Sequence, residues 1–113
     1  MNWNRIESIE TLDRILEESK ENPVVIFKHS TSCSISAMAL NRLERSWNDS
    51  EMGEVKPYYL DLIAYRDISN AVAQKFGVMH QSPQVLLIKN GECVYDDSHM
   101  GISYQNLKSG AVA

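Results

Sequence analysis

The sequence predicts an α/β protein whose helices cover both faces of a mixed, four-stranded sheet. Segments with helical spacing alternate with short apolar segments over most of the chain, which is typical of parallel strands joined by crossover helices. Asn90–Gly91 then separates two strand-like segments, and this dipeptide is a strong hairpin signal. With 113 residues and 43% hydrophobic content, the chain can bury a core of its own, and we expect one domain over residues 1–113.

The first two elements are an amphipathic helix and a buried strand. Apolar residues recur at helical spacing over residues 9–20, after Ser8, which is a favourable N-cap residue. Pro23 ends this helix, because the residue before a proline disfavours the helical backbone conformation. Residues 23–28 are apolar up to Lys28, which is typical of a central strand buried on both faces.

A polar turn leads from this strand into a second helix. This helix is expected from Cys33 or Ser34 to about Trp47, with an apolar stripe that includes Ile35 and Met38. We expect a polar break over residues 48–53 and a second strand over residues 55–62.

The C-terminal half completes the sheet and covers it. Asp67 is a suitable N-cap for a helix that carries apolar residues up to Phe76, and Gly77 closes it where a left-handed residue is wanted. This order implies parallel crossovers followed by an antiparallel edge. The remaining elements are expected as a strand over 84–89, its hairpin partner over 92–96 and a short helix over 103–109, frayed beyond Gly110.

Cys33 is the strongest candidate for chemistry, because it stands where a buried strand ends and an amphipathic helix begins. Unpaired amide hydrogens and the dipole at a helix start stabilise an anion, and the thiolate is the reactive form of cysteine. A lone cysteine is more often a small buried residue, but the polar neighbours favour a reactive thiol. Ser36 faces the same side of the first helical turn, so its hydroxyl could support the sulfur. The other hydroxyl-bearing neighbours are Ser30, Thr31, Ser32 and Ser34.

Ser82–Pro83 is the second signal, because it lies directly before a predicted strand and proline lacks the amide hydrogen that a central strand would use. X–Pro bonds are cis in only about 5% of folded cases, so the local sequence alone favours a trans bond. A cis-proline turn opposite the helix start at Cys33 would leave a free backbone edge for a substrate strand. The combination with Cys33 therefore favours the cis form.

The other cysteine and the histidines give weaker signals. Cys93 follows the hairpin turn on a strand, and we interpret it as a passive, buried or half-buried residue. His29 is close enough to Cys33 in the sequence to increase the thiolate population when it is protonated. His80 flanks the proline loop, and either histidine also suits an ordinary loop position. The cysteines and histidines match neither a disulfide framework nor a zinc spacing.

Charge and hydropathy exclude some functional classes. The chain has 11 basic and 15 acidic residues, a net charge of −4 and no run of Lys or Arg, so we expect no nucleic-acid or membrane partner. The polar segment 1–10 lacks the basic and apolar regions of a signal peptide. The longest apolar runs, 24–27 and 85–88, are far shorter than the roughly 20 residues that span a bilayer. We therefore expect a cytoplasmic protein with reduced thiols.

The arrangement of these residues resembles the thioredoxin superfamily: a strand, a cysteine at a helix start, a proline loop, a hairpin and a closing helix. Ser36 occupies the place of the usual second cysteine. More narrowly, residues 27–36 (FKHSTSCSIS) and 80–84 (HQSPQ) together resemble the YtxJ-type monothiol bacilliredoxin-like family, and residues 98–99 and 102–103 resemble its C-terminal segment. The resemblance covers nearly the whole chain and implies a thioredoxin-like, three-layer α/β/α fold.

This resemblance implies an enzyme, a monothiol thiol–disulfide oxidoreductase that removes the low-molecular-weight thiol bacillithiol from S-thiolated cytosolic proteins. The Cys33 thiolate attacks the small-thiol sulfur, the protein leaves as a thiol, and a second thiol or a reductase regenerates Cys33. Bacillithiol is then a co-substrate, and no metal or bound cofactor is expected. Its malate moiety is expected near carboxylate-binding groups beside Cys33, which are the helix N-terminus and His29 or Lys28. The implied thiolate-supporting residues are Ser34, Ser36 and His29, and the implied substrate-binding residues are Thr31, Ser82, Pro83 and Gln84.

Two other functional classes remain open. Monothiol glutaredoxins use one cysteine and an external thiol to hold a two-iron, two-sulfur cluster between two subunits. Their cysteine precedes Gly-Phe, whereas Ser34-Ile35 stands here. A redox-silent interaction module with the same fold is the third class. The surroundings of Cys33 disfavour it, and a thiol that reacts no faster than glutathione would favour it again.

Overall fold

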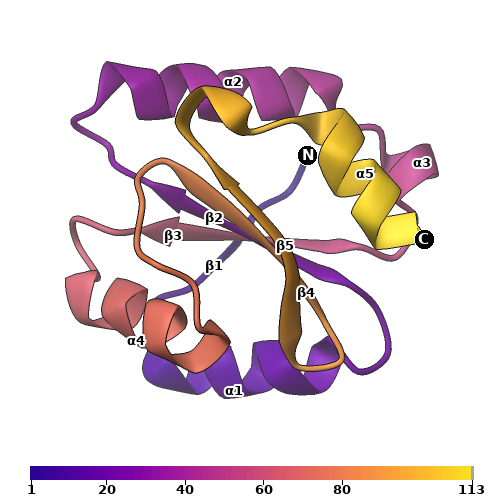
Figure 1. Ribbon diagram of the computed structural model, residues 1–113, viewed down its shortest axis with the longest axis horizontal. Coiled ribbons are helices and arrows are strands. Elements are labelled where there is room, and N and C mark those ends of the chain that lie inside the picture. Colours follow the sequence, from indigo (N-terminus) through magenta and orange to yellow (C-terminus); the bar gives the residue numbers. More distant parts are fainter. Residues whose placement is uncertain (113) are drawn as a thin grey trace.

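The computed structural model describes residues 1–112 and contains a mixed five-stranded sheet between helices (Figure 1). The predicted α/β class is confirmed. The sheet has five strands, whereas four were predicted. The strands are β1 (Asn4–Arg5), β2 (Val24–His29), β3 (Lys56–Asp61), β4 (Gln84–Lys89) and β5 (Glu92–Ser98). Their order in the sheet is β1-β3-β2-β4-β5, with β2 parallel to β3 and antiparallel to β4.

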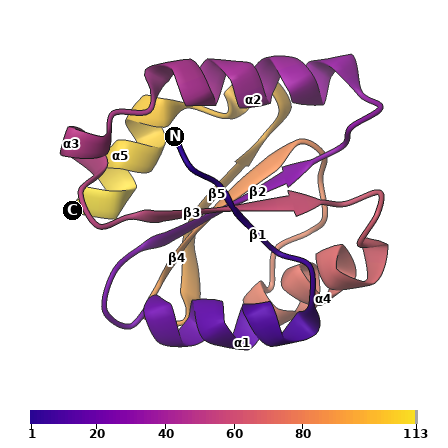
Figure 2. The ribbon, with the colours of Figure 1, turned by 180° about the vertical axis from the view of Figure 1, so that it is seen from behind.

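Two layers of helices enclose the sheet. They contain α1 (Ile9–Glu18), α2 (Ser34–Ser46), α3 (Asp49–Met52), α4 (Arg66–Phe76), the 3-10 turn η1 (His99–Gly101) and α5 (Tyr104–Val112). Helices α1 and α4 cover one face, and α2 and α5 cover the other, as Figure 1 and the view from behind in Figure 2 show. None of the helices in residues 1–112 is both long enough and apolar enough to cross a membrane.

Strand β1 is the element that the sequence analysis missed. Both of its residues are exposed, so they show no alternation of apolar and polar side chains. They nevertheless pair in parallel with β3, where Asn4 lies opposite Tyr58. The next residue, Ile6, donates its N–H to the Tyr59 carbonyl (2.9 Å) and buries its side chain. A tertiary contact at Ile6 therefore holds this strand, and no local pattern reports it.

Several helix boundaries differ from the prediction. The N-cap of α4 is Tyr65, so Asp67 lies inside the first turn and does not cap the helix. The Asp61 side chain accepts hydrogen bonds from two following backbone N–H groups, which forms a turn that starts the helix earlier. The predicted polar break over 48–53 contains α3, because the asparagine before it caps a helical turn. Gly77 closes α4 with φ 64°, the left-handed conformation that was predicted.

The C-terminal elements are longer than predicted. Strand β5 continues to Ser98, and α5 continues through Val112. The predicted fraying beyond Gly110 is therefore wrong for residues 111 and 112, while Ala113 lies outside the described residues. Ala111 is buried in the core, and this packing extends the helix.

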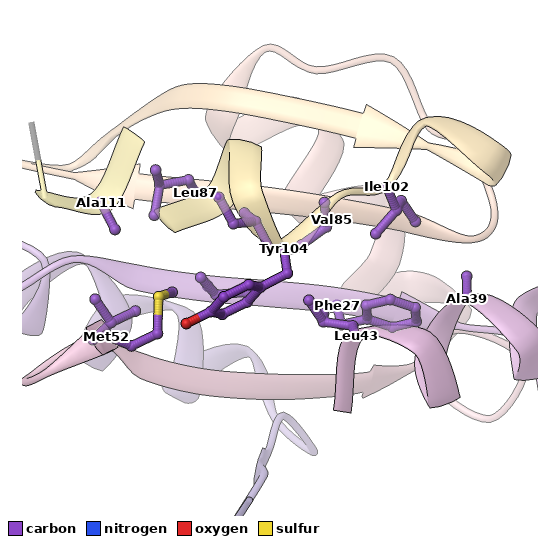
Figure 3. Packing of buried hydrophobic residues seen from close by; sticks show 12 residues of the cluster. Phe27, Ala39, Leu43, Met52, Val85, Leu87, Ile102, Tyr104 and Ala111 are labelled. Atoms are coloured by element: carbon purple, nitrogen blue, oxygen red, sulfur yellow. The ribbon is translucent and has the colours of Figure 1, made fainter. Parts of the chain in front are cut away.

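Strand β2 lies at the centre of both apolar cores. All six of its residues are buried, as its apolar run predicted. Val25 and Phe27 face the α2 and α5 layer, where Figure 3 shows Phe27 beside Leu43. Val24 and Ile26 face the α1 and α4 layer. The two sets alternate along one strand, so β2 joins the cores on both sides of the sheet.

The register of the central strands brings three chain segments to one end of the sheet. Lys28 in β2 pairs with Gln84 in β4, and Gln84 pairs with Ser98 in β5. Cys33 follows β2, and Pro83 directly precedes β4. The start of α2, the proline loop and η1 therefore meet at this end, on the left of Figure 1.

We predict that Ile6→Ala lowers the free energy of unfolding by about 2–5 kcal/mol, because it removes the buried side chain that anchors β1. Urea unfolding followed by circular dichroism measures this change. Ile9→Ala is the matched control, because Ile9 is 45% exposed in α1 and its replacement should change stability by less than about 0.5 kcal/mol. Equal effects of the two substitutions would contradict the anchoring role of Ile6.

Candidate active site

The Cys33 thiol lies at the N-terminus of α2 and is half-buried. Its backbone is extended (φ −111°, ψ 120°), as is usual for an N-cap residue. Its N–H donates to the Ser30 carbonyl (3.1 Å), and its carbonyl accepts the Ala37 N–H (3.1 Å). The sulfur has no hydrogen-bond partner among residues 1–112. It therefore remains available to an incoming group, at a helix end where amide hydrogens lack partners within the helix.

Ser36 lies in the first turn of α2 and is completely buried. Its Oγ accepts the Ser30 N–H (3.0 Å) and lies 2.7 Å from Nδ1 of His29. These two hydrogen bonds join the end of β2 to the start of α2 and hold the turn that carries Cys33. Ser36 forms no hydrogen bond to the Cys33 sulfur in residues 1–112, so its observed contacts are to the turn and to His29.

His29 is buried at the end of β2, with its ring centroid 5.6 Å from that of Tyr59. Burial lowers the pKa of His29, and the nearby carboxylates of Asp61 and Glu44 offset only part of this effect. The imidazole is therefore neutral at pH 7. The sequence suggested a protonated His29 as support for the thiolate, and the buried ring does not provide that charge at this pH. Its contact with the site is the hydrogen bond to Ser36.

The proline loop presents an open backbone edge. The Ser82–Pro83 peptide bond is cis, as predicted. Pro83 is buried, and its carbonyl accepts the His99 N–H (3.0 Å), which ties the loop to η1. Ser82 is half-buried, and its backbone N–H and carbonyl have no partner within the described residues. This is the free edge that the sequence led us to expect.

Gln84 shapes the proline loop from inside. Its side chain is almost completely buried. Its Nε2 donates to the Met79 carbonyl (3.0 Å), and its Oε1 accepts the Gln81 N–H (3.4 Å). The family resemblance implies substrate binding by Gln84, whereas in this structure its side chain turns toward the backbone of the loop. The direction of a side chain at a strand start depends on packing, which the sequence does not report.

The other predicted site residues divide between surface and interior. Thr31 and Ser34 are exposed on either side of Cys33 in the sequence. The Lys28 side chain is fully buried on the face of β2 opposite to that of His29. Burial lowers the pKa of its ammonium to about 8. His29 is only 7% exposed as well, so in this structure neither side chain presents a surface to a ligand carboxylate, contrary to what the resemblance had led us to expect.

Exposed apolar side chains surround this end of the sheet, and the sequence analysis missed them. Ile35 and Met38 lie on the first turns of α2, with 49% and 60% of their surfaces exposed. Met79 in the proline loop and Met100 in η1 are also exposed. The predicted helical stripe placed Ile35 and Met38 in the core. Of the predicted stripe, Ala39 and Leu43 are buried, and Ser36 completes the buried face of α2.

Cys93 lies too far from Cys33 to form a disulfide with it. It pairs with Ile88, near the end of β4 that is remote from Gln84. Along β4, four residues separate Ile88 from Gln84, which is a distance of about 13 Å. The Cα atoms of bridged cysteines lie within about 7 Å of each other. Burial raises the pKa of the Cys93 thiol, and its Sγ donates to the Tyr95 carbonyl (3.3 Å).

In residues 1–112, no three His, Cys, Asp or Glu side chains are grouped to hold a metal ion.

The strand order, the cysteine at the start of α2 and the cis-proline loop define a thioredoxin-fold protein with one cysteine in its site. Two solved thioredoxins share this fold at 19% identity. That of Malassezia sympodialis has a TM-score of 0.73, and the alignment covers 98% of this chain and 89% of that one. That of Fasciola hepatica has a TM-score of 0.68, with 96% of each chain covered.

The family assignment rests on two closer matches. A thioredoxin-fold protein provisionally described as an oxidoreductase is 31% identical, with a TM-score of 0.80 and coverage of 96% of this chain and 92% of that one. The family model of the monothiol bacilliredoxin BrxC matches residues 4–107. The chain belongs to the monothiol bacilliredoxin family. Both matches support a thioredoxin-like redox function and oxidoreductase activity.

We predict that Ser36→Ala lowers the free energy of unfolding by about 1–3 kcal/mol, because the Ser30 N–H loses the acceptor it has at 3.0 Å. Ser34→Ala provides the control at an exposed position of the same helix, where we expect a change below about 0.5 kcal/mol. Urea unfolding of both variants measures the difference. A loss no larger for Ser36→Ala than for Ser34→Ala would show that the buried hydroxyl does not hold the turn.

Proposed function

We propose that this protein is a monothiol thiol–disulfide oxidoreductase that removes bacillithiol from S-thiolated cytosolic proteins. The observation that carries the proposal is the half-buried Cys33 thiol, which has no hydrogen-bond partner in the described part of the chain and lies at the same end of the sheet as the open backbone of Ser82. Membership in the monothiol bacilliredoxin family supports the same reaction class. The identity of the small thiol comes from this family resemblance.

The reaction is an exchange of one disulfide for another. The Cys33 thiolate attacks the bacillithiol sulfur of the mixed disulfide, the S–S bond to the protein breaks, and the protein sulfur leaves as a thiolate that takes a proton from water. Cys33 then carries the bacillithiol cap. A second bacillithiol thiolate attacks the bacillithiol sulfur of this cap, which frees Cys33 and forms bacillithiol disulfide.

An external thiol is needed because no second cysteine is in reach. Ser36 has a hydroxyl where a dithiol enzyme has its resolving thiol, and Cys93 is remote. The capped form of Cys33 therefore persists until a small thiol or a reductase arrives. This persistence is what a carrier of low-molecular-weight thiols requires.

The surface around Cys33 suits a protein substrate in extended conformation. The N–H and carbonyl of Ser82 can pair with a substrate backbone in the manner of an added strand. Ile35 and Met38 lie within the first two turns of α2 after Cys33 and can cover apolar side chains beside the modified cysteine. Methionine is unbranched and adaptable, so such a surface accepts many sequences.

We predict that Cys33→Ser abolishes transfer of the small thiol while the circular dichroism spectrum stays unchanged, because the loss is chemical. Cys93→Ser should retain nearly all of the wild-type rate. Intact-protein mass spectrometry after mixing with a bacillithiolated test protein detects one small-thiol adduct on Cys33 in the wild-type protein. Absence of the adduct, or its presence on Cys93, would refute the assignment.

We also predict that Ser36→Cys converts the protein into a dithiol enzyme, because Cα atoms three residues apart in a helical turn are within disulfide range. The cap on Cys33 should then be released as a free thiol, and the protein should lose the mass of two hydrogens as the new disulfide forms. Ser34→Cys is the control, since an adjacent thiol does not meet this geometry. Persistent capping of Ser36→Cys would show that a thiol at position 36 does not reach the Cys33 sulfur.

A further inference from the structure

Lys28 places an ammonium group inside the protein, with no carboxylate of residues 1–112 paired with it. Its side chain is fully buried, and its Nζ donates to the Ser69 carbonyl (3.1 Å) and to Nδ1 of His80 (3.3 Å). Lys28 takes part in no ion pair within residues 1–112. Burial lowers the pKa of Lys28 to about 8, so the group remains largely charged at pH 7. Taking such a charge out of water is costly, and uncompensated charges of this kind are found preferentially at functional sites.

The contact with Lys28 determines which nitrogen of His80 carries a hydrogen. An ammonium group can only donate, so Nδ1 of His80 must accept, and the Ser69 hydroxyl also lies 3.3 Å from this nitrogen. Burial lowers the pKa of His80, and the positive charges of Lys28 and Arg66 lower it further, so the ring is neutral. In a neutral ring whose Nδ1 accepts, the hydrogen is on Nε2. This Nε2–H has no partner among the described residues, and His80 is exposed.

His80 lies at the same end of the sheet as Cys33. It belongs to the proline loop, and its partner Lys28 pairs with Gln84 at the end of β2, five residues before Cys33 in the sequence. The Gln84 side chain holds the carbonyl of Met79 and the N–H of Gln81, which are the residues on either side of His80. The free Nε2–H is thus a donor whose position and direction are set by the interior.

We propose that His80 binds a carboxylate of the capping small thiol through its Nε2–H, and that Lys28 is the buried cation that positions and polarises this histidine. The inference rests on the proposed exchange reaction at Cys33. The bound carboxylate supplies the negative charge that Lys28 lacks, so an ammonium–imidazole–carboxylate chain runs from the interior to the surface. Hydrogen bonds to a carboxylate are stronger than neutral ones, and linked hydrogen bonds reinforce each other. The charge of Arg66 at the start of α4 acts in the same direction.

The first experiment compares two caps that differ only in esterification of their carboxyl groups, on one test protein: glutathione, which has two carboxylates, and glutathione diethyl ester, which has none. The measured quantity is kcat and KM for transfer of each cap to Cys33. We expect the wild-type protein to prefer the free-acid cap about tenfold, through KM. His80→Phe, a surface change that keeps a ring, and Lys28→Met, which keeps the chain length, should each reduce this preference to below about threefold.

Controls separate this role from others. Lys20→Met removes one positive charge at an exposed position directly after α1. It should leave the preference for the free-acid cap unchanged. Replacing the acidic residues beside the modified cysteine of the test protein with amides distinguishes a carboxylate on the cap from one on the protein. The inference is overturned if the wild-type protein shows no preference between the caps, if both variants keep it, or if the preference follows the acids of the test protein.

A second readout is independent of the reaction. Nitrogen-15 NMR of the imidazole should show His80 as the Nε2–H tautomer in the wild-type protein and as a mixture of tautomers in Lys28→Met. A ring protonated on Nδ1, or a tautomer insensitive to Lys28, would overturn the positioning role. Failure of the proposed function is a separate outcome, because then a bacillithiol cap also forms no adduct on Cys33, whatever the NMR result.

Discussion

The antiparallel pairing of β2 with β4 is the interaction on which the rest of the structure depends. Its register sets Lys28 opposite Gln84 and thereby brings the turn that carries Cys33 beside the loop that carries Pro83. A slip of one residue would move every side chain of β2 to the other face of the sheet. Because all six residues of β2 are buried, that slip would disrupt both cores at once. The geometry of the site is therefore a consequence of how the core strand packs.

Two buried polar networks brace the site from opposite faces of the sheet. The alternation of β2 sends His29 toward α2, where it meets Ser36, and sends Lys28 toward α4, where it meets Ser69 and His80. Within the described residues, no buried side-chain nitrogen or oxygen lacks a hydrogen-bond partner. Satisfied networks of this kind specify one arrangement, since an unpaired polar group in the interior is costly. One network holds the turn before the helix and the other reaches the proline loop.

The parts of the site that the sequence predicted are those with a local physical cause. A cysteine between a buried strand and an amphipathic helix is a local pattern, and so is a proline directly before a strand. The parts that failed depend on direction. Gln84 turns inward although it belongs to the predicted substrate loop, and Met38 turns outward although it belongs to an apolar stripe. Helical spacing defines a face but not which neighbour covers it, because that depends on elements far away in the sequence.

The sequence by itself determined the fold class, the order of the main elements and the position of the candidate nucleophile Cys33 at a helix start, because apolar periodicity, turn residues and helix starts act over a few neighbouring residues. The tertiary structure alone decided that β1 joins the sheet edge, that His29 is neutral beside Ser36, and that a buried Lys28 orients His80. These features arise from contacts between residues up to 54 positions apart, such as Asn4 and Tyr58 in the strand pairing. Burial and distance set their chemistry, and neither is a property of a local stretch of chain.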